Sequence, residues 1–204
     1  MCGRFSSRWP REAWNAVLGP GQWLDEGHSV SCGDVFPGQW TWVVVRPGEV
    51  QAMRWGWRVD WTSRLLINAR RETVAARPTF RAALHQRGAV LADAFYEWQA
   101  SPRGEKQPWR IALCEGEPLL LAALWRQEAD GTRAVIVLTE PAAPELAWLH
   151  DRQPVAVPGA ELAQWLTGPW PTALKSLAPT SAPGTRWQWE TVPGPGRRAG
   201  KDGS

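Results

Sequence analysis

Short apolar runs, rather than long amphipathic repeats, dominate the hydrophobic pattern of this 204-residue chain. The runs over 41–46 and 49–55 flank a Pro-Gly pair, which predicts a β-hairpin. Trp109 to Leu113 is expected to pair with Leu119 to Trp125 across Glu115-Gly116-Glu117. Further strands are expected over 89–92, 95–99, 134–139 and 186–191.

Helical spacing is limited to four short stretches, over 11–18, 79–86, 144–149 and 161–166. Strands with a few short helices, and no regular βαβ alternation, predict an α+β fold built around antiparallel sheet. The length suits one domain with a substantial core, which we expect over 1–191. Residues 192–204 are rich in proline, glycine and charge and lack apolar anchors, so we expect a disordered tail.

Composition narrows the class of protein. No apolar run approaches the roughly 20 residues that span a bilayer, and Met-Cys-Gly-Arg-Phe at the start forms no secretory signal. We therefore expect a cytoplasmic protein without a membrane partner. The cysteines (Cys2, Cys32 and Cys114) and the three histidines are widely spaced, which argues against a disulfide framework and a metal cluster. We expect no metal and no cofactor.

Charge and aromatic content give only weak support for a nucleic-acid partner. The formal net charge is +3, and Arg197, Arg198 and Lys201 against Asp202 place +2 of it in the tail. Contact with DNA would therefore need a local basic patch. Sixteen tryptophans are expected mainly to fill core positions, whereas base stacking requires a particular exposed tryptophan.

Cys2 is the most informative single residue. A small residue at position 2 favours removal of Met1, which leaves an α-amine and a thiol on adjacent carbons. Because the amine titrates near about 7.7 to 8.0, a sizeable fraction is a neutral nucleophile at physiological pH. It can condense with an aldehyde to an imine, which the thiol then closes into a thiazolidine. The alternative is that Cys2 is simply a small residue tolerated after methionine.

Three further segments carry candidate chemistry. Asn68 and Arg70 are alternate residues after an apolar run, so they could hold a sugar or phosphate oxygen from one face, unless the segment is a solvated turn. Glu97 lies in an aromatic strand, where desolvation would raise the pKa of its carboxyl, unless it points outward. His150 follows a short predicted helix and could shuttle protons, or could merely cap that helix.

Together these segments resemble the SRAP family, the SOS-response-associated peptidases or abasic-site-processing proteins. Four blocks match in order: Cys2-Gly-Arg-Phe5, Asn68-Ala-Arg-Arg-Glu-Thr73, Ala92-Asp-Ala-Phe-Tyr-Glu-Trp98 and His150-Asp-Arg-Gln-Pro154. Weaker matches are Val35-Phe-Pro-Gly38, Arg54-Trp-Gly56 and Leu138-Thr-Glu140. The resemblance implies a mainly antiparallel sheet in a barrel-like arrangement with a few short helices.

The resemblance also implies covalent capture of abasic sites in single-stranded DNA, by lyase-like Schiff-base chemistry with an accompanying self-processing peptidase activity. Cys2 corresponds to the cross-linking nucleophile, and Asn68 and Arg70 to residues that orient the opened sugar and its 3′ phosphate. Glu97 corresponds to the acid/base beside the terminal amine. His150 corresponds to the proton donor that opens the sugar ring and later helps to reverse the adduct.

Further residues correspond to DNA contacts. Trp61 matches an aromatic that stacks where the DNA is kinked, and weaker correspondences to DNA contacts are Arg4, Pro37, Arg77, Thr139 and Arg152. The chain departs from the usual family residues at Val59, Leu91, Ala94 and Asp34. We expect a monomer whose partner is abasic single-stranded DNA and which joins the nucleoid when bound.

Two other functions remain open from the sequence. An N-terminal-nucleophile hydrolase, such as a class II glutamine amidotransferase, also begins Cys-Gly and would use the amine as the base for the thiol. The chain shows none of the glutamine-pocket segments of those enzymes. The second alternative is a non-covalent single-strand-binding module that uses tryptophan stacking and basic residues.

Overall fold

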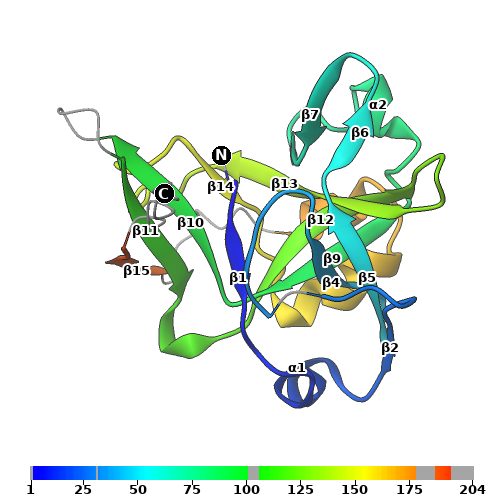
Figure 1. Cartoon of the computed structure of the whole chain (residues 1–204), viewed down its shortest axis with the longest axis horizontal. Helices are drawn as coiled ribbons and strands as arrows, with labels where there is room; N and C mark the ends of the chain where they lie inside the picture. Colours follow the sequence, from blue (N-terminus) through cyan, green and yellow to red (C-terminus); the bar gives the residue numbers. More distant parts are fainter. Residues whose placement is uncertain (1, 31, 101–105, 178–186, 194–204) are drawn as a thin grey trace, which may run out of the picture.

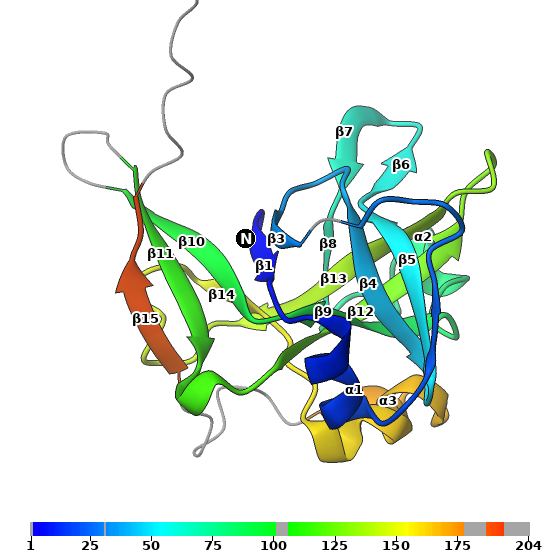
Figure 2. The ribbon, with the colours of Figure 1, turned by 60° about the horizontal axis from the view of Figure 1, so that its bottom comes forward.

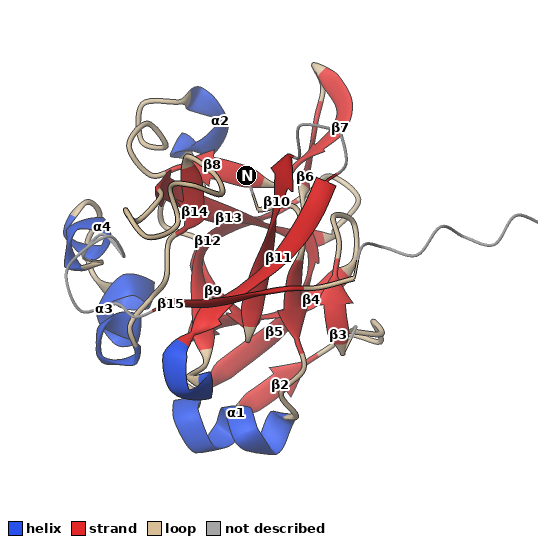
Figure 3. Ribbon diagram, turned by 90° about the vertical axis from the view of Figure 1, so that its left-hand side faces the viewer, coloured by secondary structure: helices blue, strands red, loops and turns tan. Residues whose placement is uncertain are grey.

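The computed structural model describes residues 2–30, 32–100, 106–177 and 187–193. In this part the chain forms two main sheets and a two-stranded ribbon, with short helices around them (Figures 1 and 3). The helices are α1 (Arg11–Leu18), α2 (Pro78–Arg81), α3 (Leu162–Thr167) and α4 (Thr172–Ser176), with 3-10 turns η1 (Cys114–Gly116) and η2 (Gly159–Glu161). No helix of the described residues is long and apolar enough to cross a membrane.

The smaller sheet is antiparallel and has the order β15-β11-β10-β1-β3. Its strands are β1 (Phe5–Ser7), β3 (Gly33–Val35), β10 (Ala94–Ala100), β11 (Lys106–Leu113) and β15 (Trp187–Thr191). The N-terminal strand β1 therefore lies inside this sheet and not at its edge. Figure 2 shows β1 between the β10–β11 hairpin and strands β8 and β13.

The larger sheet is mixed and has the order β14-β13-β12-β9-β4-β5-β2. Its strands are β2 (Gln22–Leu24), β4 (Trp40–Arg46), β5 (Glu49–Trp55), β9 (Arg87–Ala92), β12 (Leu119–Gln127), β13 (Arg133–Pro141) and β14 (Arg152–Pro154), and β8 (Asn68–Arg70) pairs with β13. A parallel pairing of β13 with β5 closes five of these strands into a ring. Strands β6 (Trp57–Val59) and β7 (Thr62–Leu66) form the separate ribbon.

Two apolar cores pack on opposite faces of the larger sheet, and strand β12 shows why. Leu119 and Leu121 enter the core that also contains Cys2, whereas Leu120 and Leu124 enter the other core. Successive residues of a strand point to opposite faces, so a strand covered on both sides reads as a continuous apolar run. Tryptophans are among the largest fully buried side chains, as expected: Trp14, Trp55, Trp57 and Trp165.

The α+β class and most of the expected elements are confirmed. The β4–β5 hairpin, the extended segments β9 and β10, the buried strand β13 and helix α1 lie where the pattern predicts them. The late strand is confirmed over 187–191, and position 186 lies outside the described residues, as do positions 194–204 of the expected tail. Helix α3 begins one residue later than predicted.

Three local predictions are wrong. Strands β11 and β12 do not pair with each other: β11 pairs with β10 and β15, and β12 pairs with β9 and β13. The 3-10 turn η1 carries the chain from one sheet to the other. Residues 144–149 form consecutive turns and not a helix, and in 79–86 only α2 is helical.

Gly56 provides a test of this packing. It has φ +110°, and an added Cβ would lie 2.9 Å from the Cβ of Leu65. Left-handed strain and overpacking together should make Gly56→Ala reduce the free energy of unfolding by about 2 to 5 kcal/mol. Gly131 is the control, because it has φ +84° with no atom within 4 Å of an added Cβ. Gly131→Ala should cost about 1 to 2 kcal/mol in urea unfolding, and equal losses in both variants would contradict the packing argument.

Candidate functional site

Strand β1 holds Cys2 in the core between the two sheets. Its side chain is 0% exposed, and its Sγ lies 3.6 Å from the carbonyl oxygen of Arg4. The backbone carbonyl of Cys2 accepts a hydrogen bond from Nδ2 of Asn68 at 2.9 Å. Burial, reinforced by the negative charge of Glu97, raises the pKa of the Cys2 thiol well above its ordinary value. The thiol is therefore protonated at neutral pH and is a poor nucleophile by itself.

Glu97 on β10 is the buried carboxyl of the site. Its side chain is 4% exposed, and burial raises its pKa above the ordinary value. The positive charge of His150 lowers the pKa of Glu97, and the charge of Asp151 raises it again. Because the charge of Glu97 also raises the pKa of the Cys2 thiol, the carboxyl and the thiol are electrostatic neighbours. Glu97 is thus placed for proton transfer beside the start of the chain.

His150 lies across a small cavity that Glu97 also lines, together with Phe95, Ile111, Leu146, Leu149, Arg152 and Gln153. Its Nδ1 lies 2.9 Å from the backbone N–H of Arg152 and 2.8 Å from the carboxylate of Asp151. These contacts suit different protonation states. The neutral ring accepts from the N–H of Arg152, whereas the protonated ring donates to Asp151. One ring nitrogen of His150 is therefore held by the protein in either protonation state.

Asn68 and Arg70 both come from β8, which runs parallel to β13. The Oδ1 atom of Asn68 is buried and accepts no hydrogen bond from the described residues. Arg70 is exposed, and its guanidinium makes no hydrogen bond or ion pair with the described part of the chain. A buried acceptor and an available cation on alternate residues can hold a hydroxyl and an anionic group.

Arg152 and Thr139 lie behind this surface and are both buried. The Arg152 guanidinium binds both carboxylate oxygens of Glu72, at 2.9 and 3.0 Å, and the carbonyl of Thr139 at 2.7 Å. Burial favours a higher pKa for Glu72, but the hydrogen bonds and charge of Arg152 hold it below its ordinary value. The structure therefore makes Arg152 a paired residue that lines the cavity, with Thr139 supporting it.

The other predicted DNA contacts are spread over the surface. Arg4 stacks its guanidinium 3.9 Å from the ring centroid of Tyr96 and pairs with Asp34 at 2.5 Å. Pro37 is exposed in the turn between β3 and β4, and Arg77 is exposed just before α2. Trp61 is 68% exposed in the turn that joins β6 to β7. The structure thus groups Cys2, Asn68, Glu97 and His150 and leaves Trp61 on a projecting ribbon (Figure 1).

Sequence reasoning assigned no role to Asp93, which joins the two sheets. This residue lies between β9 and β10, where the chain crosses from the larger sheet to the smaller one. Its carboxylate accepts hydrogen bonds from the Ser6 hydroxyl (2.8 Å), the Arg8 backbone N–H (2.8 Å) and the Arg110 guanidinium (2.9 Å). Its position in the same block as Glu97 was the available signal. Asp93 fixes β1 against β10 and so fixes Cys2 relative to Glu97.

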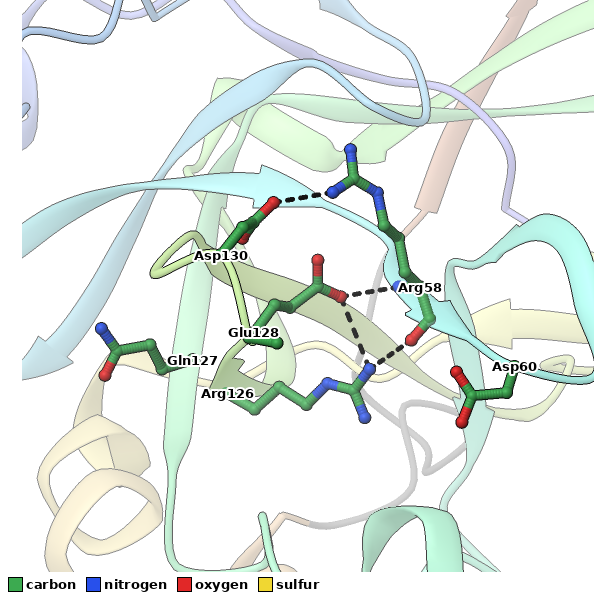
Figure 4. Close-up of a pocket in the computed structure, with 7 residues that line it drawn as sticks. Arg58, Asp60, Arg126, Gln127, Glu128 and Asp130 are labelled. Carbon is green, nitrogen blue, oxygen red and sulfur yellow. Dashed lines mark hydrogen bonds and ion pairs between the residues drawn. The ribbon is translucent and has the colours of Figure 1, made fainter.

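A second hollow, lined by Arg58, Arg126, Glu128 and Asp130 among others, contains several charged groups but pairs them with one another (Figure 4). Arg58 binds Asp130 at 2.7 Å, and Glu128 accepts from the backbone N–H of Arg58 at 2.6 Å and from Arg126 at 3.4 Å. Such internally neutralised charges leave little attraction for an ionic ligand. Within the described ranges, no three His, Cys, Asp or Glu side chains are grouped to hold a metal ion.

Comparison with known proteins shows the family of this chain. The model of the SOS response associated peptidase (SRAP) family matches residues 1–194. The chain is 28% identical over 177 residues to the abasic site processing protein YedK of Escherichia coli, covering 81% of this chain and 79% of that protein. It is 27% identical over 179 residues to the abasic site processing protein YoqW of Bacillus subtilis, covering 81% and 80%.

Solved structures show the same fold. A crystal structure of a protein from Bordetella bronchiseptica superposes with a TM-score of 0.79 at 25% identity, covering 94% of this chain and all of that one. A phage-related protein from the same organism gives a TM-score of 0.72 at 26% identity, covering 94% of each chain. The chain belongs to the SOS response associated peptidase family.

Asp34, one of the departures from the usual family residues, provides a pH test. Burial favours a higher pKa, but hydrogen bonds from Arg4 and Tyr96 and the charges of Arg4 and Arg8 hold the pKa of Asp34 below 3.8. A lowered carboxyl pKa stabilises the fold above the ordinary value, and this stabilisation is lost as the pH falls through the folded-state pKa. At pH 7, Asp34→Asn should cost about 1 kcal/mol.

Urea unfolding between pH 7 and pH 3 checks this expectation. The difference between wild type and Asp34→Asn should stay constant down to about pH 5 and narrow below it. Asp25→Asn is the control, because its pair with Arg11, at 3.8 Å, is about half exposed on both sides. It should change stability little at any pH. A difference for Asp34→Asn that stays the same down to pH 3 would exclude the ionised pair as its cause.

Proposed function

We propose that this protein recognises abasic sites in single-stranded DNA and, once Met1 is removed, bonds Cys2 covalently to the sugar aldehyde. The observation that carries the proposal is the grouping of the buried residues Cys2, Asn68 and Glu97 with His150. The names of the bacterial relatives, abasic site processing proteins, indicate the same substrate. The adduct would shield the lesion until it is reversed.

The amine acts before the thiol in this mechanism. Burial raises the pKa of the Cys2 thiol, so little thiolate is available for a first attack. The free α-amine attacks the aldehyde carbon, and loss of one water from the carbinolamine gives an imine. The S–H bond then adds across the C=N bond, with sulfur bonding to carbon and the proton going to nitrogen. The product is a thiazolidine, and one water is released overall.

The same pKa argues against the hydrolase alternative. An N-terminal-nucleophile hydrolase attacks its substrate with the thiol sulfur, and the amine serves as its base. A fully buried thiol whose carboxylate neighbour further raises its pKa is poorly suited to that first step. In the proposed mechanism the thiol reacts second and within the same residue, where proximity replaces high nucleophilicity.

Glu97 and His150 divide the proton transfers. Glu97, next to Cys2, accepts a proton from the attacking amine. His150, whose Nδ1 is held by the protein, donates a proton to the sugar ring oxygen and releases the aldehyde from its closed hemiacetal. The same transfers in reverse reopen the thiazolidine, so reversal also depends on Glu97.

Asn68 and Arg70 position the opened sugar. The buried Oδ1 of Asn68 is available to accept a hydrogen bond from a sugar hydroxyl, while its Nδ2 holds the Cys2 carbonyl. The exposed guanidinium of Arg70 binds the 3′ phosphate, an anion that suits its planar donors. One strand thereby aligns the substrate with the residue that attacks it.

Substitution at position 2 tests the covalent chemistry. Cys2→Ala retains the amine but cannot close the ring, so its imine hydrolyses and no adduct survives a denaturing gel. Cys2→Ser has a weaker ring-closing oxygen and should give a faint adduct. Borohydride, which reduces imines, should restore a stable product with Cys2→Ala and so serves as the control. A denaturation-resistant adduct of Cys2→Ala without borohydride would contradict the ring-closing step.

Single-turnover cross-linking tests the proton transfers. Glu97→Gln and His150→Ala should each slow adduct formation by about 10² to 10⁴. At acid pH the general acid is protonated, whereas the base must be ionised and the amine neutral. The wild-type log rate should therefore rise with slope about 2 below the pKa of Glu97 and about 1 just above it. Burial places that break above the ordinary 4.5. Glu97→Gln should show slope about 1 over the same acid range.

Thermal unfolding of the same variants provides the control. If Glu97 and His150 only brace the fold, both variants lose melting temperature together with activity. Wild-type cross-linking rates in stable Glu97→Gln and His150→Ala proteins would remove these two residues from the mechanism. A wild-type slope of 2 that persists in Glu97→Gln would assign the second proton to another group.

Trp61 and the form of the DNA test the recognition step. A continuous duplex is stiff and costly to kink toward a buried site, so single strands should bind and cross-link better. Trp61→Ala should weaken binding to an oligonucleotide with a non-reactive abasic analogue by about 1 to 3 kcal/mol, and Trp61→Phe by less. Equal cross-linking yields with paired and unpaired abasic DNA would contradict the proposed substrate.

A further inference from the structure

Three indoles form a cluster on the smaller sheet that the proposed chemistry does not use. Trp109 lies on β11, Trp189 on β15 and Trp148 in the turns over 144–149. The ring centroids of Trp109 and Trp148 are 5.0 Å apart with planes at 86°, and those of Trp148 and Trp189 are 6.4 Å apart at 57°. Trp148 is 44% exposed and Trp189 is 40% exposed.

This cluster lies on the same sheet face as Glu97. Glu97 is directly paired with Trp109, and Trp109 is directly paired with Thr191. Trp189 precedes Thr191 by two residues, and both paired and alternate residues share a face of a sheet. Trp148 precedes His150 by two residues. The indole cluster therefore begins where the cavity of Glu97 and His150 ends.

Trp148 is not needed to hold its turn against the core, because neighbouring residues already do so. Leu146 is 3% exposed and Leu149 packs against the core that contains Cys2. The Nε1 of Trp148 donates to the carbonyl of Glu145 at 2.9 Å, which satisfies the polar atom and orients the ring. What remains exposed is apolar ring surface on two adjacent indoles, and contiguous apolar surface of this kind marks a contact site more often than scattered residues do.

The chemistry of an abasic site indicates which ligand binds the indole cluster. An abasic nucleotide has no base to stack, so binding energy must come from the nucleotides on either side. Figures 1 and 2 show the start of β1 between the β6–β7 ribbon, which carries Trp61, and strands β11 and β15, which carry Trp109 and Trp189. A strand that passes Cys2 thus meets exposed aromatic surface on both sides.

We propose that Trp148 and Trp189 form a stacking platform for a nucleobase on the flank of the abasic nucleotide opposite to the flank that Trp61 contacts. This proposal rests on the proposed function, because the DNA is placed by its bond to Cys2. It recognises the π face that all four bases share, so it is tolerant of sequence. It extends the site from the lesion to the neighbouring undamaged strand.

Flank-length dependence of binding tests the platform. Single-stranded oligonucleotides with a tetrahydrofuran abasic analogue, which has no aldehyde, are extended by one to four nucleotides on the 5′ side only or on the 3′ side only. Wild-type affinity should rise with each flank. Trp148→Ala and Trp189→Ala should lose about 5- to 100-fold, the size of one base–aromatic stack, on one side only. Trp61→Ala should lose a similar amount of affinity on the opposite flank only.

Two controls keep the result specific. Trp148→Phe retains an aromatic face and should keep most of the gain from the flank. Leu24→Ala removes a side chain that is also 40% exposed, on β2, and should change neither flank. Unchanged dependence on both flanks in stable Trp148→Ala and Trp189→Ala proteins would overturn the platform. The platform would also be overturned if wild type sediments as a dimer and these variants sediment as monomers with unchanged DNA binding. The indoles would then be a self-association surface.

Cross-linking separates this proposal from the one on which it rests. With limiting aldehyde-bearing DNA, Trp148→Ala should cross-link less than wild type, because the platform contributes to DNA binding. If wild type forms no Cys2-dependent adduct, but Trp148→Ala and Trp189→Ala still lose affinity on one flank only, the capture chemistry fails and the platform stands. If the adduct forms with Cys2 but neither indole variant alters either flank, the platform fails and the capture chemistry stands.

Discussion

The fold depends on burying the first residues of the chain between two sheets. Strand β1 lies inside the smaller sheet, where it pairs with β10 on one side and with β3 on the other, so its removal would leave β3 without a partner in that sheet. Asp93 binds Ser6 and Arg8 at the point where the chain crosses between the sheets. These contacts fix a segment that in most proteins is free to fray.

The same burial determines the chemistry that this site can perform. Because Cys2 and Glu97 share a desolvated space, burial raises the pKa of both, and each is neutral over a wider pH range than in water. A neutral thiol and a carboxyl of raised pKa suit a sequence in which the amine attacks first and the thiol closes the ring. Asn68 extends this arrangement to the substrate, because one end of its amide holds Cys2 and the other is left to accept a hydrogen bond.

Local pattern predicted local structure well and long-range pairing poorly. The Pro-Gly pair predicted the β4–β5 hairpin, and the helical spacing over 11–18 predicted α1. The same logic failed for β11 and β12, which were expected to pair with each other. Instead β11 pairs with the preceding strand β10 and with distant β15, and β12 pairs with the following strand β13 and with distant β9. Motif blocks named the candidate residues of the site. The folded chain adds that Arg152 is paired with Glu72 and that Asp93 links β1 to the start of β10.

The mass of the cross-linked protein tests the central claim most directly. The protein is incubated with a single-stranded oligonucleotide that carries one abasic site, and the intact adduct is weighed without any reductant. The account predicts the mass of the chain without Met1, plus the oligonucleotide, minus one water, with the modification on the peptide that begins at Cys2. An adduct that retains Met1, or one attached at any other residue, would contradict capture by the terminal cysteine.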